Sequence, residues 1–227
     1  MKETALVIMA KRPVIGKTKT RLCPFLTPEE AARLYEALLR DTIALVERVN
    51  IVADLAVAIT PPESQAYFAG ITPPGTRLLP VTGSDIGYCL GQALGRLFDL
   101  GYKRVLALNS DGPSLPLDYL HQAIQCLNQA DLVLGPAQDG GYYLVGMKQL
   151  HQEIFQGIAW STERVLSQTL ARAQGLSLSV AQTPPWYDID TPSDLARLQA
   201  DLASTAPGSL VHTRAILFNL AINNRTG

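Results

Sequence analysis

Three acidic residues stand where stretches of strand character come to an end. Asp111 closes the apolar run that begins at Val105, and a glycine and a proline follow it. In an open α/β sheet, ligands bind in the crevice at the carboxyl ends of the strands, so Asp111 is expected to face a cleft. Asp188 and Asp190 alternate just before a helix-capping motif, which does not account for them. Acids so placed suit a hard divalent cation that carries phosphates, although Asp111 alone is also a good cap for the following turn or helix.

A loop rich in cations follows the first apolar run, residues 5–10. Its five cations lie within eleven residues of a chain whose net charge is only −1: Lys11, Arg12, Lys17, Lys19 and Arg21. Pro13 and Gly16 bend the backbone between them, so its amides can turn inward while the cations converge. Bent amides and fixed cations both favour anions, which predicts a phosphate site. The alternative is a solvated basic loop.

The sequence from Gly16 to Thr18 resembles part of the P-loop of nucleoside triphosphatases. That motif requires a glycine where this chain has Lys11, and a helix that starts at the lysine. Pro24 and Pro28 oppose such a helix. We expect the helix to begin only at Pro28, after a threonine cap with a capping-box glutamate.

A glycine- and tyrosine-rich stretch, residues 135–146, is the third informative segment. Gly140 and Gly141 let the backbone approach a ligand closely, and Tyr142 offers a flat ring with a polar tip. Asp139 is suited to orient an acceptor rich in hydroxyl groups. The same Asp-Gly sequence also favours a tight hairpin turn without any function, and both interpretations remain open.

The elements that must position these residues alternate between strand and helix patterns. This alternation predicts an α/β fold with three α/β/α layers and a mostly parallel sheet. Strands are expected at residues 5–10, 55–60, 77–81, 105–110, 131–135 and 176–180, and helices from residue 28, from about 86 to 101, over 117–129, from about 163 and from 192. Residues 1–203 are predicted to form one domain. A C-terminal tail, 204–227, is expected to contain a loop at 204–209, a short helix at 213–219 and a frayed end.

Composition excludes several classes of function. The chain has 227 residues, 47% of them hydrophobic, which is ample for one core. A net charge of −1 gives no reason to expect binding to nucleic acid or to an acidic membrane surface. The three cysteines and three histidines are scattered, without the spacing of a zinc site or a disulfide framework. No apolar stretch is long enough to span a bilayer, so we expect a cytoplasmic protein.

Five motifs occur in order and carry a resemblance to a known family. They are Lys11-x-Pro13-x-x-Gly16-x-x-Lys19-Thr20-Arg21-Leu22, Ser110-Asp111-x-Pro113-x-Leu115-Pro116, Gly135-Pro136-Ala137-x-Asp139-Gly140-Gly141-Tyr142-Tyr143, Trp160-Ser161-Thr162 and Asp188-x-Asp190-Thr191-Pro192. Over residues 4–200 the chain resembles the bacterial glycosyltransferase-like family of the nucleotide-diphospho-sugar transferase superfamily, of the selenodomain-associated or arsenosugar-biosynthesis type. The first and last motifs are also similar to phospholactate guanylyltransferases and molybdenum-cofactor nucleotidyltransferases.

The resemblance implies a GT-A fold and a metal-dependent transferase that uses a nucleotide-activated donor, most simply a glycosyltransferase with a nucleotide-diphospho-sugar and a small-molecule acceptor. It implies that Mg²⁺ or Mn²⁺ is held by Asp111 and Asp190, with Asp188 in support. Lys19 and Arg21 would steady the leaving phosphate, and Asp139 and Tyr142 would face the acceptor. Catalytic roles would fall to Asp111, Asp139, Lys19 and Arg21, and donor binding to Lys11, Pro13, Gly16, Lys19, Arg21, Asp85, Gly140, Gly141 and Tyr142.

Two departures from the family pattern keep other functions open. Val81, Tyr88 and Cys89 stand where the family has glutamine and a Glu-Arg pair, and Gly112 and Ser114 follow Asp111 where serine and a second aspartate are common. The alternatives are therefore a nucleotidyltransferase that releases pyrophosphate and a nucleotide-binding protein without turnover. The sequence does not identify the base, the sugar, the acceptor or the oligomeric state.

Overall fold

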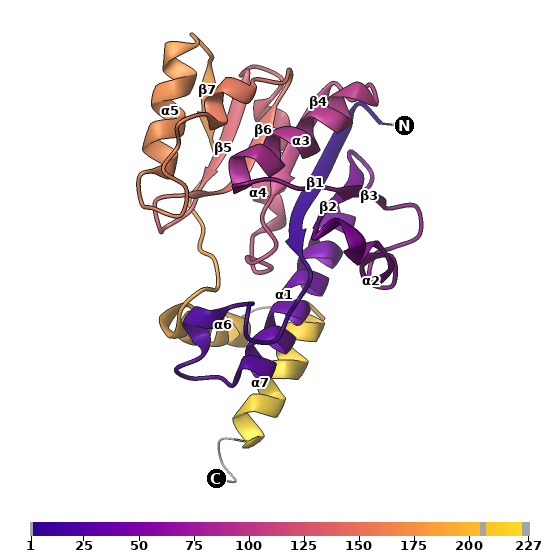
Figure 1. Cartoon of the computed structure of the whole chain (residues 1–227), viewed down its shortest axis with the longest axis vertical. Coiled ribbons are helices and arrows are strands. Elements are labelled where there is room, and N and C mark those ends of the chain that lie inside the picture. Colours follow the sequence, from indigo (N-terminus) through magenta and orange to yellow (C-terminus); the bar gives the residue numbers. More distant parts are fainter. Residues whose placement is uncertain (1, 205–207, 224–227) are drawn as a thin grey trace.

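A computed structural model of the chain describes residues 2–204 and 208–223. Its centre is one seven-stranded sheet with the strand order β3-β2-β1-β4-β6-β5-β7 (Figure 1). The strands are β1 (Thr4–Lys11), β2 (Asp54–Thr60), β3 (Arg77–Pro80), β4 (Arg104–Leu108), β5 (Leu132–Pro136), β6 (Tyr142–Met147) and β7 (Val180–Gln182). All neighbours are parallel except β6, which runs antiparallel to both β4 and β5. The mostly parallel α/β fold expected from the sequence is thereby confirmed.

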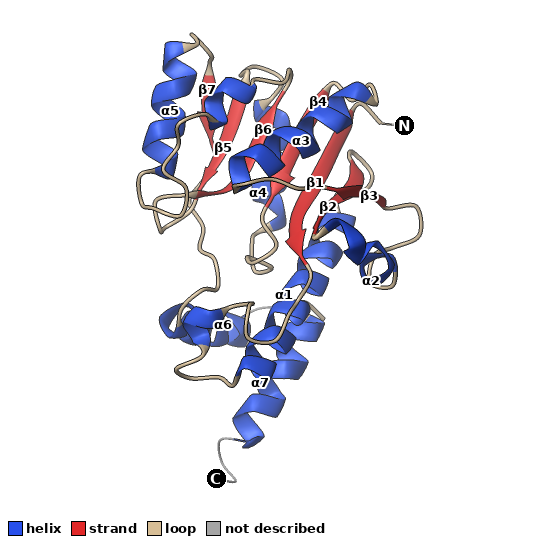
Figure 2. Ribbon diagram, in the orientation of Figure 1, coloured by secondary structure: helices blue, strands red, loops and turns tan. Residues whose placement is uncertain are grey.

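The helices lie around this sheet: the earlier ones flank both of its faces, and the last two pack beyond its carboxyl edge (Figure 2). They are α1 (Pro28–Glu47), α2 (Gln65–Ala69), α3 (Ile86–Asp99), α4 (Leu117–Cys126), α5 (Val165–Gly175), α6 (Pro192–Ser204) and α7 (Val211–Asn223), with short 3-10 turns at Thr20–Leu22, Pro62–Ser64 and Gln152–Phe155. The start of α1 is as predicted. Thr27 and Glu30 form a reciprocal capping box, in which each backbone N–H donates to the other side chain. Within the ranges described, no helix has the length and apolar character that crossing a membrane requires.

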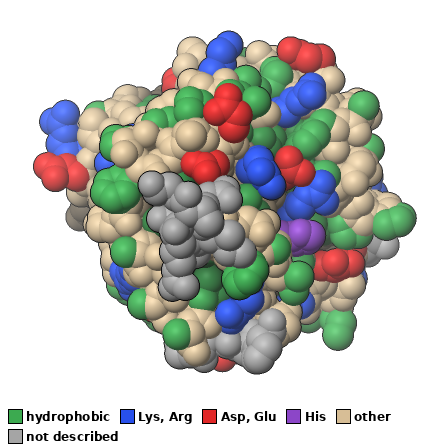
Figure 3. All heavy atoms as spheres, turned by 90° about the horizontal axis from the view of Figure 1, so that it is seen from below, with side chains coloured by type: hydrophobic (Ala, Val, Ile, Leu, Met, Phe, Trp, Pro, Cys, Tyr) green, Lys and Arg blue, Asp and Glu red, His purple; other side chains and the backbone are tan. Residues whose placement is uncertain are grey.

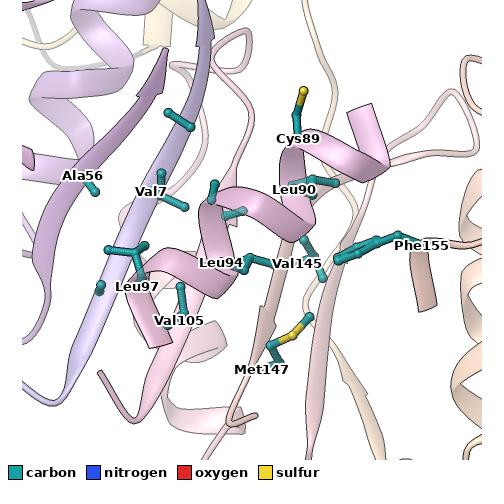
Figure 4. Packing of buried hydrophobic residues seen from close by; sticks show 14 of the residues in the cluster. Val7, Ala56, Cys89, Leu90, Leu94, Leu97, Val105, Val145, Met147 and Phe155 are labelled. Atoms are coloured by element: carbon teal, nitrogen blue, oxygen red, sulfur yellow. The ribbon is translucent and has the colours of Figure 1, made fainter. Parts of the chain in front are cut away.

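The three layers follow from alternation along the strands. In β1, Ala5 and Val7 face a cluster closed by α3 and α5, while Leu6 and Ile8 face a second cluster closed by α1, α2 and α4. Figure 4 shows the first cluster, in which Leu94 and other side chains of α3 lie over the central strands. Because each central strand is buried on both faces, it reads as a continuous apolar run.

A third hydrophobic cluster lies beyond the carboxyl edge of the sheet and is called here the helical cluster. It joins the first half of α1 to α6, α7 and the segments around Leu22 and Ile189. α7 packs along α1, and the buried carboxylate of Asp41 accepts the N–H groups of His212 (3.2 Å) and Thr213 (2.7 Å) at the start of α7. Seen from below in Figure 3, acidic and basic side chains are interspersed on this face.

The C-terminal helix expected at 213–219 is present and extends over Val211–Asn223. Of the loop expected at 204–209, residue 204 still belongs to α6 and residues 205–207 lie outside the described residues, as does the expected frayed end after residue 223. The last strand was predicted too early: residues 176–177 form a turn, residues 178–179 have no regular structure, and β7 begins at Val180. α5 continues to Gly175, and Ser177 then adopts a left-handed conformation (φ 56°), which ends the helix before the strand can start.

Candidate active site

The carboxyl ends of β1, β4, β5 and β7 meet at one edge of the sheet, together with the start of the antiparallel β6. The loop after β1 and the segment before α6 lie beyond the same edge (Figure 1). Two adjoining cavities open here. They share Met9, Arg21, Ile86, Asn109, Ser161 and Asp190 in their linings.

The charged cavity has a volume of about 500 Å³. Its other lining residues are mostly ionic or polar and include Lys11, Lys17, Lys19, Asp111 and Asp188. The aromatic cavity has a volume of about 590 Å³ and is lined by aromatic rings, among them Tyr142 and Trp160, and by the carboxylates of Asp139 and Glu163 as well as the shared Asp190. The two cavities together are large enough for a drug-sized ligand.

Lys19 lies between two carboxylates in the charged cavity. Its Nζ is 2.8 Å from Oδ2 of Asp111 and 2.7 Å from Oδ1 of Asp190, and only 5% of its side chain is exposed. Burial alone would lower the pKa of Lys19, but the charges of the two aspartates outweigh burial and raise it. Lys19 is therefore an ammonium held in place by acids. Its backbone is left-handed (φ 50°), a strained conformation for a residue with a side chain.

Asp188 completes the acidic group but has a different partner. Its Oδ1 accepts a hydrogen bond from Nδ2 of Asn109 at 2.6 Å. Burial, with the nearby charge of Asp111, raises the pKa of Asp188 to about 7. This carboxyl takes up a proton more readily than an ordinary aspartate, because burial and the like charge of Asp111 both disfavour its ionised form.

A chain of hydrogen bonds reaches Asp111 from α1. The Tyr35 hydroxyl accepts the N–H of Lys11 at 3.1 Å, and it lies 2.8 Å from the Ser110 hydroxyl. Ser110 in turn donates to Oδ1 of Asp111 at 3.1 Å. Because the Ser110 proton points to Asp111, the Tyr35 hydroxyl must be the donor to Ser110. This network fixes one oxygen of Asp111 while the other contacts Lys19.

The donor set fits a divalent cation in its chemistry. Asp111 and Asp190 come from different segments and converge on one position, which the Lys19 ammonium holds as a stand-in cation. Mg²⁺ and similar ions accept carboxylate oxygens and often use only one or two of them, with phosphate and water supplying the rest. Across the described ranges, no three His, Cys, Asp or Glu side chains form a ready-made metal cluster.

The aromatic cavity is built around Trp160. A Cβ placed on Gly87 would lie 2.4 Å from Cζ2 of Trp160, so the ring rests directly on the first turn of α3 and only glycine fits there. The Tyr142 ring meets Trp160 edge-on, with 6.4 Å between the centroids. Asp139 accepts the Gly141 N–H at 2.9 Å, so it also shapes the turn between β5 and β6. The hairpin interpretation is thus confirmed, while the ligand-facing role of Asp139, which also lines the cavity, stays a prediction.

Most of the residues predicted for the site meet at this edge. The two cavities are lined by Lys11, Lys19, Arg21, Asp111, Asp139, Gly141, Tyr142, Asp188 and Asp190. Four others do not line them. Asp85 caps α3 by accepting the Tyr88 N–H (2.9 Å) and borders a separate cavity. Pro13 and Gly16 shape the loop, and Gly140 (φ 89°) packs against the backbone of Glu163.

Sequence reasoning missed several residues of the site, namely Met9, Tyr35, Ile86, Asn109 and Glu163. Asn109 and Tyr35 had a usable signal. Asn109 is a polar residue two positions before Asp111 at the end of an apolar strand, and Tyr35 puts a hydroxyl on the buried face of a helix, where it requires a partner. Met9 and Ile86 carry no polar mark and are found only from the fold.

Comparison with known proteins places this geometry in context. A family model described as "Uncharacterized protein conserved in bacteria (DUF2064)" matches residues 42–162. Among curated proteins, none matches the chain. A crystal structure of a candidate nucleotide-diphospho-sugar transferase from Desulfovibrio desulfuricans G20 is 31% identical, with a TM-score of 0.90, and the match covers 100% of this chain and 98% of that one.

More distant structures share the fold alone. CMP:2-keto-3-deoxy-manno-octonic acid synthetase, solved with CTP, has a TM-score of 0.53 at 14% identity, over 90% of this chain and 99% of that one. Rv0371c from Mycobacterium tuberculosis H37Rv, solved with manganese, has a TM-score of 0.56 at 16% identity, over 87% and 97%. The sheet and its flanking helices are thus of the nucleotide-diphospho-sugar transferase type.

Proposed function

The chain belongs to the DUF2064 family, and from this premise we propose that it transfers a sugar from a nucleotide diphosphate to a neutral, hydroxyl-bearing acceptor. The narrower placement with the selenodomain-associated or arsenosugar-biosynthesis type is part of the same proposal. The observation that carries it is the pairing of two adjoining cavities, one lined by cations and acids and the other by aromatic rings and acids.

The charged cavity suits the diphosphate of the donor. Lys11, Lys17 and Arg21 line it from the loop after β1, so a diphosphate bound there would meet several cations at once. Asp111 and Asp190 would hold a divalent metal, which when bound would neutralise charge on the diphosphate. Arg21 lines both cavities and would steady the charge that grows on the departing phosphate.

The aromatic cavity suits a sugar and its acceptor. The Trp160 and Tyr142 rings would pack against the apolar faces of a sugar, and Asp139 and Glu163 offer acceptors for hydroxyl protons. Of these, Asp139 is the proposed general base, because it lies in a turn that fixes its position. The carboxylates of this cavity disfavour an acceptor that carries phosphate, because like charges repel.

Nucleotidyl transfer is the second candidate, and one observation favours it. Arg21 lines the aromatic cavity, so this cavity is not free of cations and an acceptor phosphate could contact Arg21. The distant synthetase that was solved with CTP, a nucleoside triphosphate, has the same fold. In that reaction an acceptor phosphate attacks the α-phosphorus and pyrophosphate leaves.

The test is a pair of product assays on the purified protein with Mn²⁺. With a panel of nucleotide sugars, we expect slow release of nucleoside diphosphate. With nucleoside triphosphates and phosphorylated acceptors, we expect no pyrophosphate. Pyrophosphate release that depends on the acceptor would favour nucleotidyl transfer over sugar transfer as the function. No product in either assay, combined with metal-dependent nucleotide binding, would indicate a binding protein without turnover.

A further inference from the structure

The most unusual contact of the site is that of Lys19 with both Asp111 and Asp190. The sequence and the family resemblance predict that the two aspartates bind a metal and that the lysine contacts a phosphate. The structure instead joins all three, and the almost fully buried lysine sits in the position where a cation would bridge the two carboxylates. A divalent ion at this position would be repelled by the ammonium and would compete with it for these carboxylate oxygens.

We propose that Lys19 is an internal counter-ion that excludes divalent metal from Asp111 and Asp190 until a phosphate of the nucleotide draws the ammonium away. The proposal rests on the proposed function, since it takes a metal and a nucleotide diphosphate as the ligands of this site. Lys19 is thereby a positioning residue that sets the conditions under which the metal binds.

The surroundings of Lys19 allow such an exchange without a change of fold. The charged cavity contains both Lys19 and the pair of acids, so a phosphate bound there lies within the reach of a four-carbon side chain. Lys11, Lys17 and Arg21 line the same cavity and would help to bind that phosphate. One oxygen of Asp111 is already fixed by Ser110, so the carboxylate keeps its place when the ammonium leaves.

The exchange makes metal and nucleotide binding interdependent. A diphosphate that takes up Lys19 uncovers the two carboxylates and so raises the affinity for metal. By thermodynamic reciprocity, metal raises the affinity for the diphosphate by the same factor. Without nucleotide, the lysine should keep the affinity for metal low and protect the acids from adventitious cations.

The experiment measures Mn²⁺ binding by electron paramagnetic resonance of the free ion, without nucleotide, in the whole protein. Lys19→Met keeps the apolar stem and removes the ammonium, and we expect it to bind Mn²⁺ about tenfold or more tightly than the wild type. Lys148→Met is the matched control. It also removes an ammonium that is paired with an aspartate, Asp131, but at the opposite edge of the sheet, so its Mn²⁺ affinity should equal that of the wild type.

Two further variants keep the outcome interpretable. Lys19→Gln tests the same exchange with a polar side chain, in case Lys19→Met folds poorly, and thermal melting verifies the fold of each. Adding Asp111→Asn to Lys19→Met should abolish the tight Mn²⁺ binding, which locates the metal at these acids. Melting should also show that Mn²⁺ alone stabilises the Lys19 variants more than the wild type.

Equal or weaker Mn²⁺ binding by both Lys19 variants would overturn the proposal. So would tight binding that survives Asp111→Asn, or a wild type that binds Mn²⁺ equally well with and without UDP, GDP, CDP or ADP. The proposed function fails by a different result, namely the absence of nucleotide and nucleotide-sugar binding in melting experiments with every variant.

Discussion

At the amino-terminal edge of the sheet, each acidic side chain has donors of its own, whereas at the carboxyl edge two aspartates share one lysine. Glu3 is paired with Lys103 and Arg104, and Asp54 with Lys2 and the Tyr102 hydroxyl. Asp131 receives hydrogen bonds from the backbone and hydroxyl of Ser179 and is paired with Lys148. Asp54 is the first residue of β2, and Glu3 and Asp131 immediately precede β1 and β5.

The consequence appears in the protonation of the two edges. Hydrogen bonds lower the pKa of Glu3 and, against the effect of burial, that of Asp54, and they bring the pKa of Asp131 to about 2. At the other edge, burial and Asp111 raise the pKa of Asp188 to about 7. Acids that serve stability are satisfied locally, whereas acids crowded in a cleft, where two of them share one buried lysine, mark a place prepared for a charged ligand.

The largest expected difference between the edges is in metal-dependent ligand binding. Asp111→Asn should keep the fold but lose the extra stabilisation that Mg²⁺ gives in the presence of nucleotide, because a formal charge leaves the cation position. At a hundredfold excess of ligand over its Kd this stabilisation is about 2.7 kcal/mol, or about 5 °C or more in Tm. Asp54→Asn makes the same change at the opposite edge and should retain it. Melting curves with nucleotide, recorded with and without Mg²⁺, measure this stabilisation in both variants. If Asp111→Asn keeps the full Mg²⁺ effect, the two edges do not differ in metal binding.

A smaller difference is expected for the cations. In the absence of divalent metal, Lys19→Ala and Arg21→Ala should each weaken the binding of a nucleoside diphosphate by about tenfold, while binding of the bare nucleoside changes little. A hydrogen bond to a charged group contributes about 1.5–3 kcal/mol, which corresponds to that factor. Lys148→Ala is the control from the amino-terminal edge. Titration calorimetry that finds equal diphosphate affinity in all four proteins would reduce the loop after β1 to a solvated surface.

The smallest effect belongs to the stability of the amino-terminal edge. Asp131→Asn should lower the free energy of unfolding by no more than about 1 kcal/mol at pH 7, because the ion pair with Lys148 is substantially exposed. The folded-state pKa of Asp131, about 2, lies below its ordinary value of 3.8, so this contribution is present above pH about 4 and is lost as the pH falls toward 2. Denaturant unfolding of both proteins at pH 7 and at pH 2 measures it. A difference that persists at pH 2 would show another origin.

Much of the fold could be predicted because each element carries its own local signal. The capping box of Thr27 and Glu30, the Pro192 start of α6 and the apolar strands all depend on residues a few positions apart. β7 was misplaced because only three of its residues pair, and because residues 176–179 have the apolar alternation of a strand although they form a turn and a short loop. The domain boundary at 203 stays a prediction.

The candidate site was predicted as a set of residues but not as an arrangement. Lys19, Asp111 and Asp190 were each predicted from residues of their own segment. Nothing local indicates that the lysine lies between the acids, because Asp111 and Asp190 are 92 and 171 residues away from it. Asp85 shows the converse, because this motif residue caps α3 and lines neither of the two cavities, so its role in donor binding stays a prediction. Contacts of long range depend on packing, and sequence periodicity does not encode their geometry.

The helical cluster has a consequence for the lifetime of the site. Leu22 lies three residues after Lys19 and Ile189 immediately precedes Asp190, and both side chains are buried in this cluster. Proteins open locally in cooperative units, and a unit with a core of its own can open while the rest stays folded. Opening of this one would carry Lys19 and Asp190 away from Asp111 together and leave the sheet intact. Hydrogen exchange of the backbone amides around residues 22 and 189 should therefore report how long the assembled site persists, separately from the global stability of the protein.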